Sequence, residues 1–226
     1  MNEEESHRYL GRQLCTSPSH RINIEFQNRV RTAWAAFHKH KCVLLDHNIS
    51  LRLRLKMFTA SIGPALMFGT PVLPMTKHHL QQLNILQRKM LRRIVGWRRI
   101  DGEDWKETMK RMNHRLEQGQ RIYFCEPWSM IFARSQWRYI KHLMDAYPLL
   151  WARIMCKFNK YPTNDPDCDF LPRRAPGHPR MRWDDHIRSF CYKIWPESQG
   201  RHWFDILCNQ DIAKYESEYV LFIANL

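Results

Sequence analysis

Apolar residues recur at intervals of three and four along most of the 226-residue chain, which is the period of an amphipathic helix. Stretches that alternate between apolar and polar residues, as half-buried strands do, are sparse. The pattern therefore predicts a mainly α fold. We expect a helical bundle, followed by a loop-rich linker and a small helical tail.

The first part of this pattern predicts three helices. The first helix carries one apolar face, made of Ile22, Phe26, Val30, Ala33, Phe37 and Leu44. Ser50 is a residue type that caps helices, and it precedes the second helix, which Gly63 and Pro64 bend. The inward positions of this helix are Leu51, Leu55, Phe58 and Ile62. Thr76 is placed to cap the third helix and Gly96 to end it. Its inward positions are Leu80, Leu83, Met90, Leu91, Ile94 and Val95.

The same spacing predicts a fourth helix over about residues 103–118 and a fifth over about residues 128–146. Their inward positions are Trp105, Met109, Met112 and Leu116 in the fourth, and Ile131, Trp137, Ile140 and Met144 in the fifth. Residues 159–179 contain five prolines and little periodicity, so they read as a linker. After it, short helices are predicted to begin at Asp184 and near Gly200, with Ile187, Phe190, Trp203 and Leu207 inward.

An uncharged run from Met57 to Met75 is nearly long enough to span a bilayer. Glycines and prolines break it into pieces too short for one spanning helix, and basic residues lead directly into it. The breaking residues are Gly63, Pro64, Gly69, Pro71 and Pro74. The basic residues that precede the run are Arg52, Arg54 and Lys56. We therefore predict a buried, kinked helix and no membrane partner.

The charge balance is strongly basic, because 36 Lys and Arg residues against 22 Asp and Glu residues leave a formal charge of +14. Such a balance favours a polyanionic partner over an acidic small metabolite, and nucleic acid is the first candidate. The nine Trp and eight Tyr residues fit stacking on bases as well as packing in a core. Seven irregularly spaced cysteines without a signal peptide indicate reduced thiols, so we expect a cytoplasmic or nuclear location.

Asp184 and Asp185 raise the question of a metal-dependent catalytic centre. Two-metal catalysis needs carboxylates that converge on ions about 4 Å apart, whereas neighbouring residues on a helix diverge by about 100°. This pair follows a proline-rich loop and precedes a helical stretch. Asp184 therefore reads as a helix N-cap, and Asp185 as a favourable acidic residue in the first turn.

Zinc ligation has only weak support. His38, His40 and Cys42 cluster, with His38 and Cys42 four residues apart, but no second ligand pair follows at finger-like spacing. A looser set comprises Cys156, Cys168, His178, His186 and Cys191. Glycine-rich phosphate loops and the common hydrolase motifs are also missing from the sequence. We therefore predict no catalytic residues, no metal and no cofactor.

Basic residues are the more informative candidates. Six of them crowd the end of the third predicted helix, on the side opposite its apolar positions: Arg88, Lys89, Arg92, Arg93, Arg98 and Arg99. A second group lies around the linker: Arg173, Arg174, Arg180 and Arg182. Such residues can neutralise phosphates and release counterions, although charge runs are often only a solvated helix face.

The order of several short motifs resembles the C-terminal third of reverse transcriptases from non-LTR (LINE-like) retrotransposons. Residues 9–14, YLGRQL, look like the strand that closes the palm, and residues 29–44, 51–69 and 80–96 are similar to successive thumb helices. Residues 135–145, SQWRYIKHLMD, are similar to the R-W-x-G-H-x-x-R motif, and residues 177–187, GHPRMRWDDHI, match G-R-P-x-x-R-W-x-D-D-I. Departures from the usual residues occur at Phe68, Pro71, Leu73, Lys141 and His178.

The resemblance implies that residues 1–20 are a remnant of the palm-closing strand and loop, and that 21–158 are a thumb-like and connection region. Residues 159–182 would then be the linker, and 183–226 the tail. The chain contains neither the palm Y/F-A-D-D hairpin nor an endonuclease domain, so we expect a fragment without either active site. The implied partner is the template-primer, as RNA or an RNA–DNA hybrid, and no small-molecule substrate is expected.

Two other interpretations remain open at this stage. One is a host-recruited helical interaction protein without a nucleic-acid role, whose charge serves solubility. The other is a small metal-dependent nuclease that uses Asp184 and Asp185.

Overall fold

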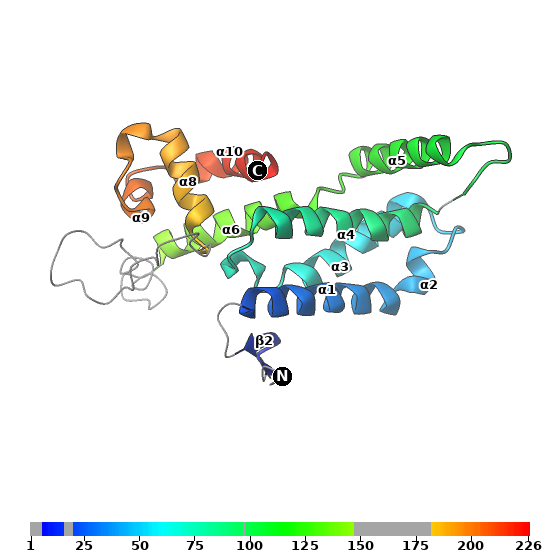
Figure 1. Ribbon diagram of the computed structural model, residues 1–226, viewed down its shortest axis with the longest axis horizontal. Coiled ribbons are helices and arrows are strands. Elements are labelled where there is room, and N and C mark those ends of the chain that lie inside the picture. Colours follow the sequence, from blue (N-terminus) through cyan, green and yellow to red (C-terminus); the bar gives the residue numbers. More distant parts are fainter. Residues whose placement is uncertain (1–5, 16–19, 97, 147–181) are drawn as a thin grey trace. The chain divides into compact units, whose positions relative to one another are not determined.

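The structure is a computed structural model that describes residues 6–15, 20–96, 98–146 and 182–226. Helices dominate these residues, which confirms the prediction of a mainly α fold (Figure 1). The chain divides into two compact units, one of residues 1–73 and 77–132 and the other of residues 74–76 and 133–226.

The first unit is a bundle of helices that carries a small hairpin. Its elements are β1 (Ser6–Tyr9), β2 (Arg12–Cys15), α1 (Arg21–Lys39), α2 (Lys41–Leu44), α3 (Leu51–Met67), the 3₁₀ helix η1 (Thr70–Val72), α4 (Lys77–Val95) and α5 (Trp105–Ile122). Helix α3 packs against both α1 and α4, and α5 packs against α4 (Figure 1). The division between the units falls inside α6 (Trp128–Asp145).

The core of this unit forms where the predicted apolar faces meet. Phe37, Phe58 and Leu83 are each at most 1% exposed. The ring of Phe58 stacks on Trp128 with centroids 5.6 Å apart and an interplanar angle of 12°. Burial of such rings is the main favourable contribution to folding, since apolar burial contributes about 25 cal/mol per Å².

Side chains of α4 hold the start of α6. Gln87 accepts a hydrogen bond from the backbone nitrogen of Trp128 at 3.1 Å and donates one to the Glu126 carbonyl oxygen at 2.8 Å. Asn84 accepts a hydrogen bond from the backbone nitrogen of Ser129 at 3.0 Å and donates one to its hydroxyl at 2.9 Å. The first N–H groups of a helix have no partner within the helix, so these amides supply one.

Three local predictions differ from the structure. The first predicted helix breaks at His40 into α1 and α2. Ser50 occupies the N-cap position of α3, but its side chain does not make the predicted capping hydrogen bond. Trp105, predicted to point inward, is 60% exposed because it begins α5, and burial on this helix starts at Thr108.

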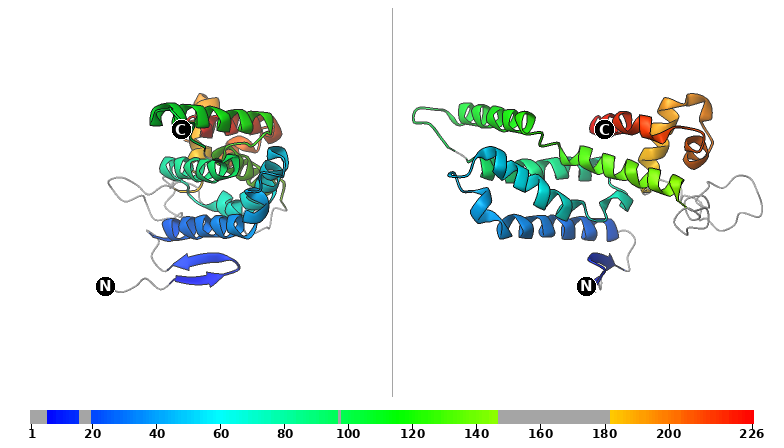
Figure 2. Two further views of the ribbon diagram at one scale, coloured as in Figure 1. Left: turned by 90° about the vertical axis from the view of Figure 1, so that its right-hand side faces the viewer. Right: turned by 180° about the vertical axis from the view of Figure 1, so that it is seen from behind.

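The predicted strand over residues 9–14 is a turn followed by a strand. Strands β1 and β2 pair antiparallel from Ser6 with Cys15 to Tyr9 with Arg12 (Figure 2). Leu10 and Gly11 form the turn with φ angles of +45° and +78°. Two successive positive φ angles match the twist of a two-residue hairpin, which explains the glycine but not the leucine.

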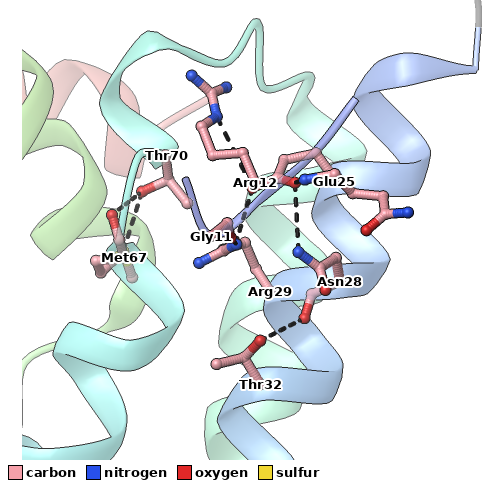
Figure 3. Close-up of polar contacts among 9 residues, drawn as sticks. Gly11, Arg12, Glu25, Asn28, Arg29, Thr32, Met67 and Thr70 are labelled. Atoms are coloured by element: carbon pink, nitrogen blue, oxygen red, sulfur yellow. Dashed lines mark hydrogen bonds and ion pairs between the residues drawn. The ribbon is translucent and has the colours of Figure 1, made fainter. Parts of the chain in front are cut away.

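A buried ion pair fixes this hairpin to α1 (Figure 3). Glu25 accepts a hydrogen bond from the backbone nitrogen of Gln13 at 2.5 Å and pairs with Arg29 Nε at 2.9 Å. Arg29 also donates a hydrogen bond to the carbonyl oxygen of Gly11 and lies 5.3 Å from the centroid of the Phe68 ring. A two-stranded hairpin is marginal by itself, so these contacts give it its support.

The second unit is built around aromatic side chains. Its elements are α6 from residue 133 onward, α8 (Asp185–Ile194), the 3₁₀ helix η2 (Pro196–Ser198), α9 (Trp203–Leu207), the 3₁₀ helix η3 (Ile212–Tyr215) and α10 (Glu216–Ala224). Trp137 packs on Phe190 and Tyr219 at centroid distances of 5.4 Å and 4.8 Å. The indole of Trp137 donates a hydrogen bond to the Ile212 carbonyl oxygen at 2.9 Å.

The proposed linker, residues 159–182, lies outside the described residues except for Arg182.

Polar groups in this core are paired as well. The Tyr219 hydroxyl donates a hydrogen bond to Gln136 Oε1 at 2.5 Å, and Gln136 Nε2 donates one to the Trp183 carbonyl oxygen at 3.0 Å. Burial raises the pKa of Tyr219 well above its ordinary value.

In the part of the chain that the structure describes, no helix has both the length and the apolar character needed to cross a bilayer.

Candidate functional site

The C-terminal half of α4 separates apolar from basic residues. Met90, Leu91, Ile94 and Val95, all predicted to face inward, are buried, each at most 4% exposed. Arg88, Lys89 and Arg93 on the other side are exposed. A helix with an apolar stripe toward the core must present its other residues to solvent, so these charges are held outward.

Gly96 ends α4, as predicted. Its φ angle is +80°, and its nitrogen donates a hydrogen bond to the Arg92 carbonyl oxygen at 3.1 Å. The positive φ angle is what favours glycine at this turn. A β-carbon would lie 3.0 Å from Cε1 of His47, an exposed ring that can move away. Arg98 and Arg99 follow this turn, and both are exposed.

Two arginines of α4 also make contacts within the protein. Arg92 is half-buried and donates a hydrogen bond to Asn113 Oδ1 at 3.0 Å, which joins α4 to α5. The guanidinium of Arg93 lies 4.9 Å from the centroid of the Trp34 ring on α1, within cation–π range. Arg92 therefore holds α5 in place, while Arg93 remains exposed beside an aromatic ring.

The loop between α4 and α5 is fixed by Glu103. Its carboxylate accepts hydrogen bonds from Arg111 Nε at 2.6 Å, from Arg111 Nη2 at 2.8 Å and from the Thr108 hydroxyl at 2.9 Å. Arg111 also donates a hydrogen bond to the carbonyl oxygen of Arg98 at 2.7 Å, and Arg99 donates one to the carbonyl oxygen of Glu103 at 3.1 Å. The hydrogen bonds and charge of Arg111 are the main reason that the pKa of Glu103 falls to about 2.

Helix α5 adds basic residues that were not among the predicted binding residues. Their side chains are exposed: Lys106, Lys110, His114, Arg115 and Arg121. The pKa of Arg54, whose Nη1 donates to the carbonyl oxygen of Ile94 at 2.6 Å, is lowered mainly by burial and also by the charge of Arg115. The repeat of basic residues at 106, 110 and 114 was the signal that could have identified this face.

The second predicted basic group is largely outside the described residues. Arg173, Arg174 and Arg180 belong to that part of the chain. Arg182 is half-buried, and its backbone nitrogen donates a hydrogen bond to Asp185 Oδ2 at 2.7 Å. The structure therefore supplies side-chain geometry only for the first group.

Asp184 and Asp185 bind different partners. Asp184 occupies the N-cap position of α8, but its side chain makes no capping hydrogen bond, so the predicted capping role is wrong. Its buried carboxylate instead accepts a hydrogen bond from Trp203 Nε1 at 3.0 Å. Asp185 accepts from Arg188 Nη2 at 2.8 Å and from the nitrogen of Arg182. The buried carboxylate of Asp184 thus accepts a hydrogen bond from the buried indole N–H of Trp203, and not from the backbone N–H groups at the start of α8.

The candidate zinc ligands that the structure describes do not form a metal site. His38 stacks on Trp34 with ring centroids 5.9 Å apart, and Cys42 is an exposed free thiol. Among the described residues, no three His, Cys, Asp or Glu side chains come together in a group that could hold a metal ion. Cys156, Cys168 and His178 lie outside those residues.

Comparison with known proteins gives one informative match. The chain is 28% identical over 96 residues to an uncharacterized transposon-derived protein from Caenorhabditis elegans, a stretch that covers 42% of this chain. The match spans 33% of that protein's length. No family model matches the chain, and no solved structure matches it. The similarity supports a transposon-related origin for this sequence.

Proposed function

We propose that this chain is the thumb and post-thumb region of a protein related to non-LTR retrotransposon reverse transcriptases, and that it binds RNA or an RNA–DNA hybrid. The binding surface is the α4 basic end, which we define as Arg88, Lys89, Arg93, Arg98 and Arg99. The order of motifs along the sequence and the similarity to a transposon-derived protein support the family assignment.

The observation that carries the binding role is the orientation of these charges. The apolar side of α4 is buried, and the loop that follows is tied to α5 by Glu103 and Arg111. The five basic side chains are therefore presented from a fixed backbone and are exposed to solvent. Lys and Arg side chains on such a surface bind phosphates and displace counterions without reading sequence.

Catalysis is not part of the proposal. The carboxylates of Asp184 and Asp185 each accept hydrogen bonds from the protein, on different partners. Two-metal chemistry needs carboxylates that share a pair of ions. We expect the purified chain to leave a primed RNA template unextended with Mg²⁺ or Mn²⁺, and extension by a sample free of other enzymes would contradict us.

Binding is tested by fluorescence anisotropy with a labelled blunt RNA–DNA hybrid at salt concentrations from about 50 to 200 mM. The test variant carries Arg88→Gln, Lys89→Gln, Arg98→Gln and Arg99→Gln. It keeps Arg92 and Arg93 because their side chains contact other helices, α5 and α1, whereas the hydrogen bond of Arg99 stays within its own loop. The slope of log affinity against log salt should fall by up to about 0.9 for each phosphate that the variant no longer neutralises.

A control of equal charge separates this surface from net charge. It carries Arg21→Gln, Lys41→Gln, Arg52→Gln and Lys56→Gln, four exposed positions of the same unit. The control should bind with a slope close to that of the parent chain. Equal losses in both variants would show that only net charge matters, and unchanged binding in the test variant would favour an interaction protein without a nucleic-acid role.

A further inference from the structure

A pocket of about 190 Å³ lies between α1 and α4, away from the α4–α5 loop. Its lining residues form one stripe on each helix: Phe26, Gln27, Val30 and Trp34 on α1, and Gln82, Ile85, Leu86 and Lys89 on α4. The spacings of three and four residues place each stripe on a single helix face. By the same measure one water molecule needs only roughly 10–15 Å³, so the pocket can admit part of a ligand.

Contacts between the two helices close the pocket at both ends. At one end His79 packs edge-on against Phe26, with centroids 4.9 Å apart, and its Nε2 lies 3.0 Å from Asn23 Oδ1. At the other end the guanidinium of Arg93 covers the ring of Trp34. The pocket occupies the interval between these two sets of contacts.

The lining offers amide groups and apolar surface together. Gln27 on α1 and Gln82 on α4 each have a carbonyl acceptor and an NH₂ donor. Neither side chain forms a hydrogen bond with the described residues. Ile85, which is 50% exposed, and the half-buried Val30 supply apolar surface beside the amides.

Positive charge is concentrated at one end of the pocket. Lys89 lines it one helical turn beyond Ile85, and Arg93 lies one turn further along α4. Lys89 is also a member of the α4 basic end. A ligand that fits therefore combines a flat, partly apolar body that has donors and acceptors at its edge with a negative group at one end.

We propose that this pocket receives an unpaired nucleobase of a single-stranded RNA segment, with the adjoining phosphate at Lys89 and Arg93. The inference rests on the proposed function, and it adds a single-strand site beside the duplex-binding surface. The base packs against Ile85 and Val30, and its edge exchanges hydrogen bonds with Gln27 and Gln82. Proteins usually read single-stranded RNA by stacking splayed bases on aromatic or guanidinium planes and by hydrogen bonding to the base edges. In this pocket the aliphatic surface of Ile85 and Val30 takes the place of the aromatic plane.

The variant that tests the pocket is Gln27→Met with Gln82→Met, which keeps side-chain length but removes the amides. Anisotropy is measured with labelled ten-nucleotide oligo(U), oligo(A) and oligo(C), and with the blunt RNA–DNA hybrid. At least one single strand should bind about tenfold more weakly, while the hybrid keeps its affinity and its salt slope. The matched control is Gln81→Met, an exposed neighbour on α4 that does not line the pocket.

A second measurement observes the pocket directly. Uridine and adenosine monophosphates, and separately a glutamate-rich peptide, are titrated into the ¹⁵N-labelled chain while the side-chain amide signals of Gln27 and Gln82 are followed. Shifts with a nucleotide support the proposal. Shifts with the peptide alone would assign the groove to an acidic protein segment, and the absence of nucleotide shifts would overturn the proposal.

The two failures are distinguishable. If the hybrid depends on the α4 basic end and the amide variant binds every single strand normally, the proposed function stands and the pocket inference is wrong. If the parent chain binds neither the hybrid nor any of the RNA single strands, the proposed function is wrong, and the nucleotide titration still decides whether the pocket takes a base.

Discussion

The carboxylate of Asp184 accepts a hydrogen bond from the indole nitrogen of Trp203 at 3.0 Å, and both side chains are buried, at 4% and 1% exposure. The bond joins the start of α8 to the first residue of α9. It also explains why a sequence pattern typical of a helix cap is used differently. Once buried, the indole N–H requires an acceptor, and Asp184 is the one that reaches it.

Replacing Asp184 tests this assignment. Asp184→Ala leaves the indole N–H buried without its acceptor and should lower the free energy of unfolding by about 1–3 kcal/mol. Asp184→Asn keeps an oxygen that can accept the bond and should cost clearly less. Urea denaturation of both variants, and of Trp203→Phe in a double-mutant cycle, measures the effect. Additive losses in the cycle would contradict a direct interaction between the two residues.

The buried pair of Glu25 and Arg29 should dominate the attachment of the hairpin. Glu25→Ala leaves the Arg29 guanidinium buried without its counter-charge, and removing one partner of a buried pair costs about 3–5 kcal/mol. Hydrogen exchange at the Gln13 amide, which donates to Glu25, should become fast in this variant. Asn28→Ala is a milder control on the same helix, because its hydrogen bond to Glu25 is 3.4 Å long. Equal exchange rates in both variants would show that the pair does not hold the hairpin.

Gln87 should be the costliest polar position on α4. It is 1% exposed and satisfies both the Trp128 nitrogen and the Glu126 carbonyl oxygen. Gln87→Leu leaves these two groups without their partner, at about 1–3 kcal/mol for each unsatisfied group. Thermal denaturation should show a large loss for this variant and a change within about 0.5 kcal/mol for the exposed control Gln81→Leu.

Glu103 should make the α4–α5 loop sensitive to acid. Its pKa falls from an ordinary 4.5 to about 2 in the folded chain, chiefly through the hydrogen bond with Arg111. Since the folded-state value is the lower one, the stabilisation is fully present above pH 4.5 and is lost as pH falls through about 2. NMR titration of the Glu103 carboxyl carbon measures the shift. In Arg111→Gln the Glu103 pKa should move back toward 4.5, and an unchanged low value would refute this cause.

Sequence periodicity was sufficient to predict the long helices α1 and α3 to α6 and most of their buried positions, because each apolar side of a helix must be covered; it did not predict α2 or α10. It identified Met90 and Ile94 as inward positions and Gly96 as the end of α4. It placed Trp105 wrongly, because an amphipathic pattern does not show where along a helix the neighbouring helices begin to cover it. The hairpin was also missed, since a leucine with positive φ at position 10 has no propensity signal.

The sequence could predict the candidate binding site only in part, because the spacing of basic residues shows which face of a helix is exposed to solvent but not what each side chain contacts. That reasoning found the arginines of α4, but it could not show that Arg92 binds Asn113, because the partner lies on another helix. The pocket between α1 and α4 depends on two stripes that lie about 55 residues apart in sequence, and their alignment follows from tertiary packing. The Asp184 interaction was missed for the same reason.

Gly96 makes the arrangement of the arginines depend on a residue that carries no charge. Its left-handed backbone ends α4 and sets the exit of the chain from the helix, shortly before Arg98 and Arg99. Substituting Gly96 would disfavour its positive φ angle and change the direction in which the backbone leaves α4, while every basic side chain remained in the sequence. A scan that neutralises only lysines and arginines would overlook this position. Damage to the proposed nucleic-acid binding surface by drift in such a transposon-related sequence can therefore begin at a glycine, with the net charge still intact.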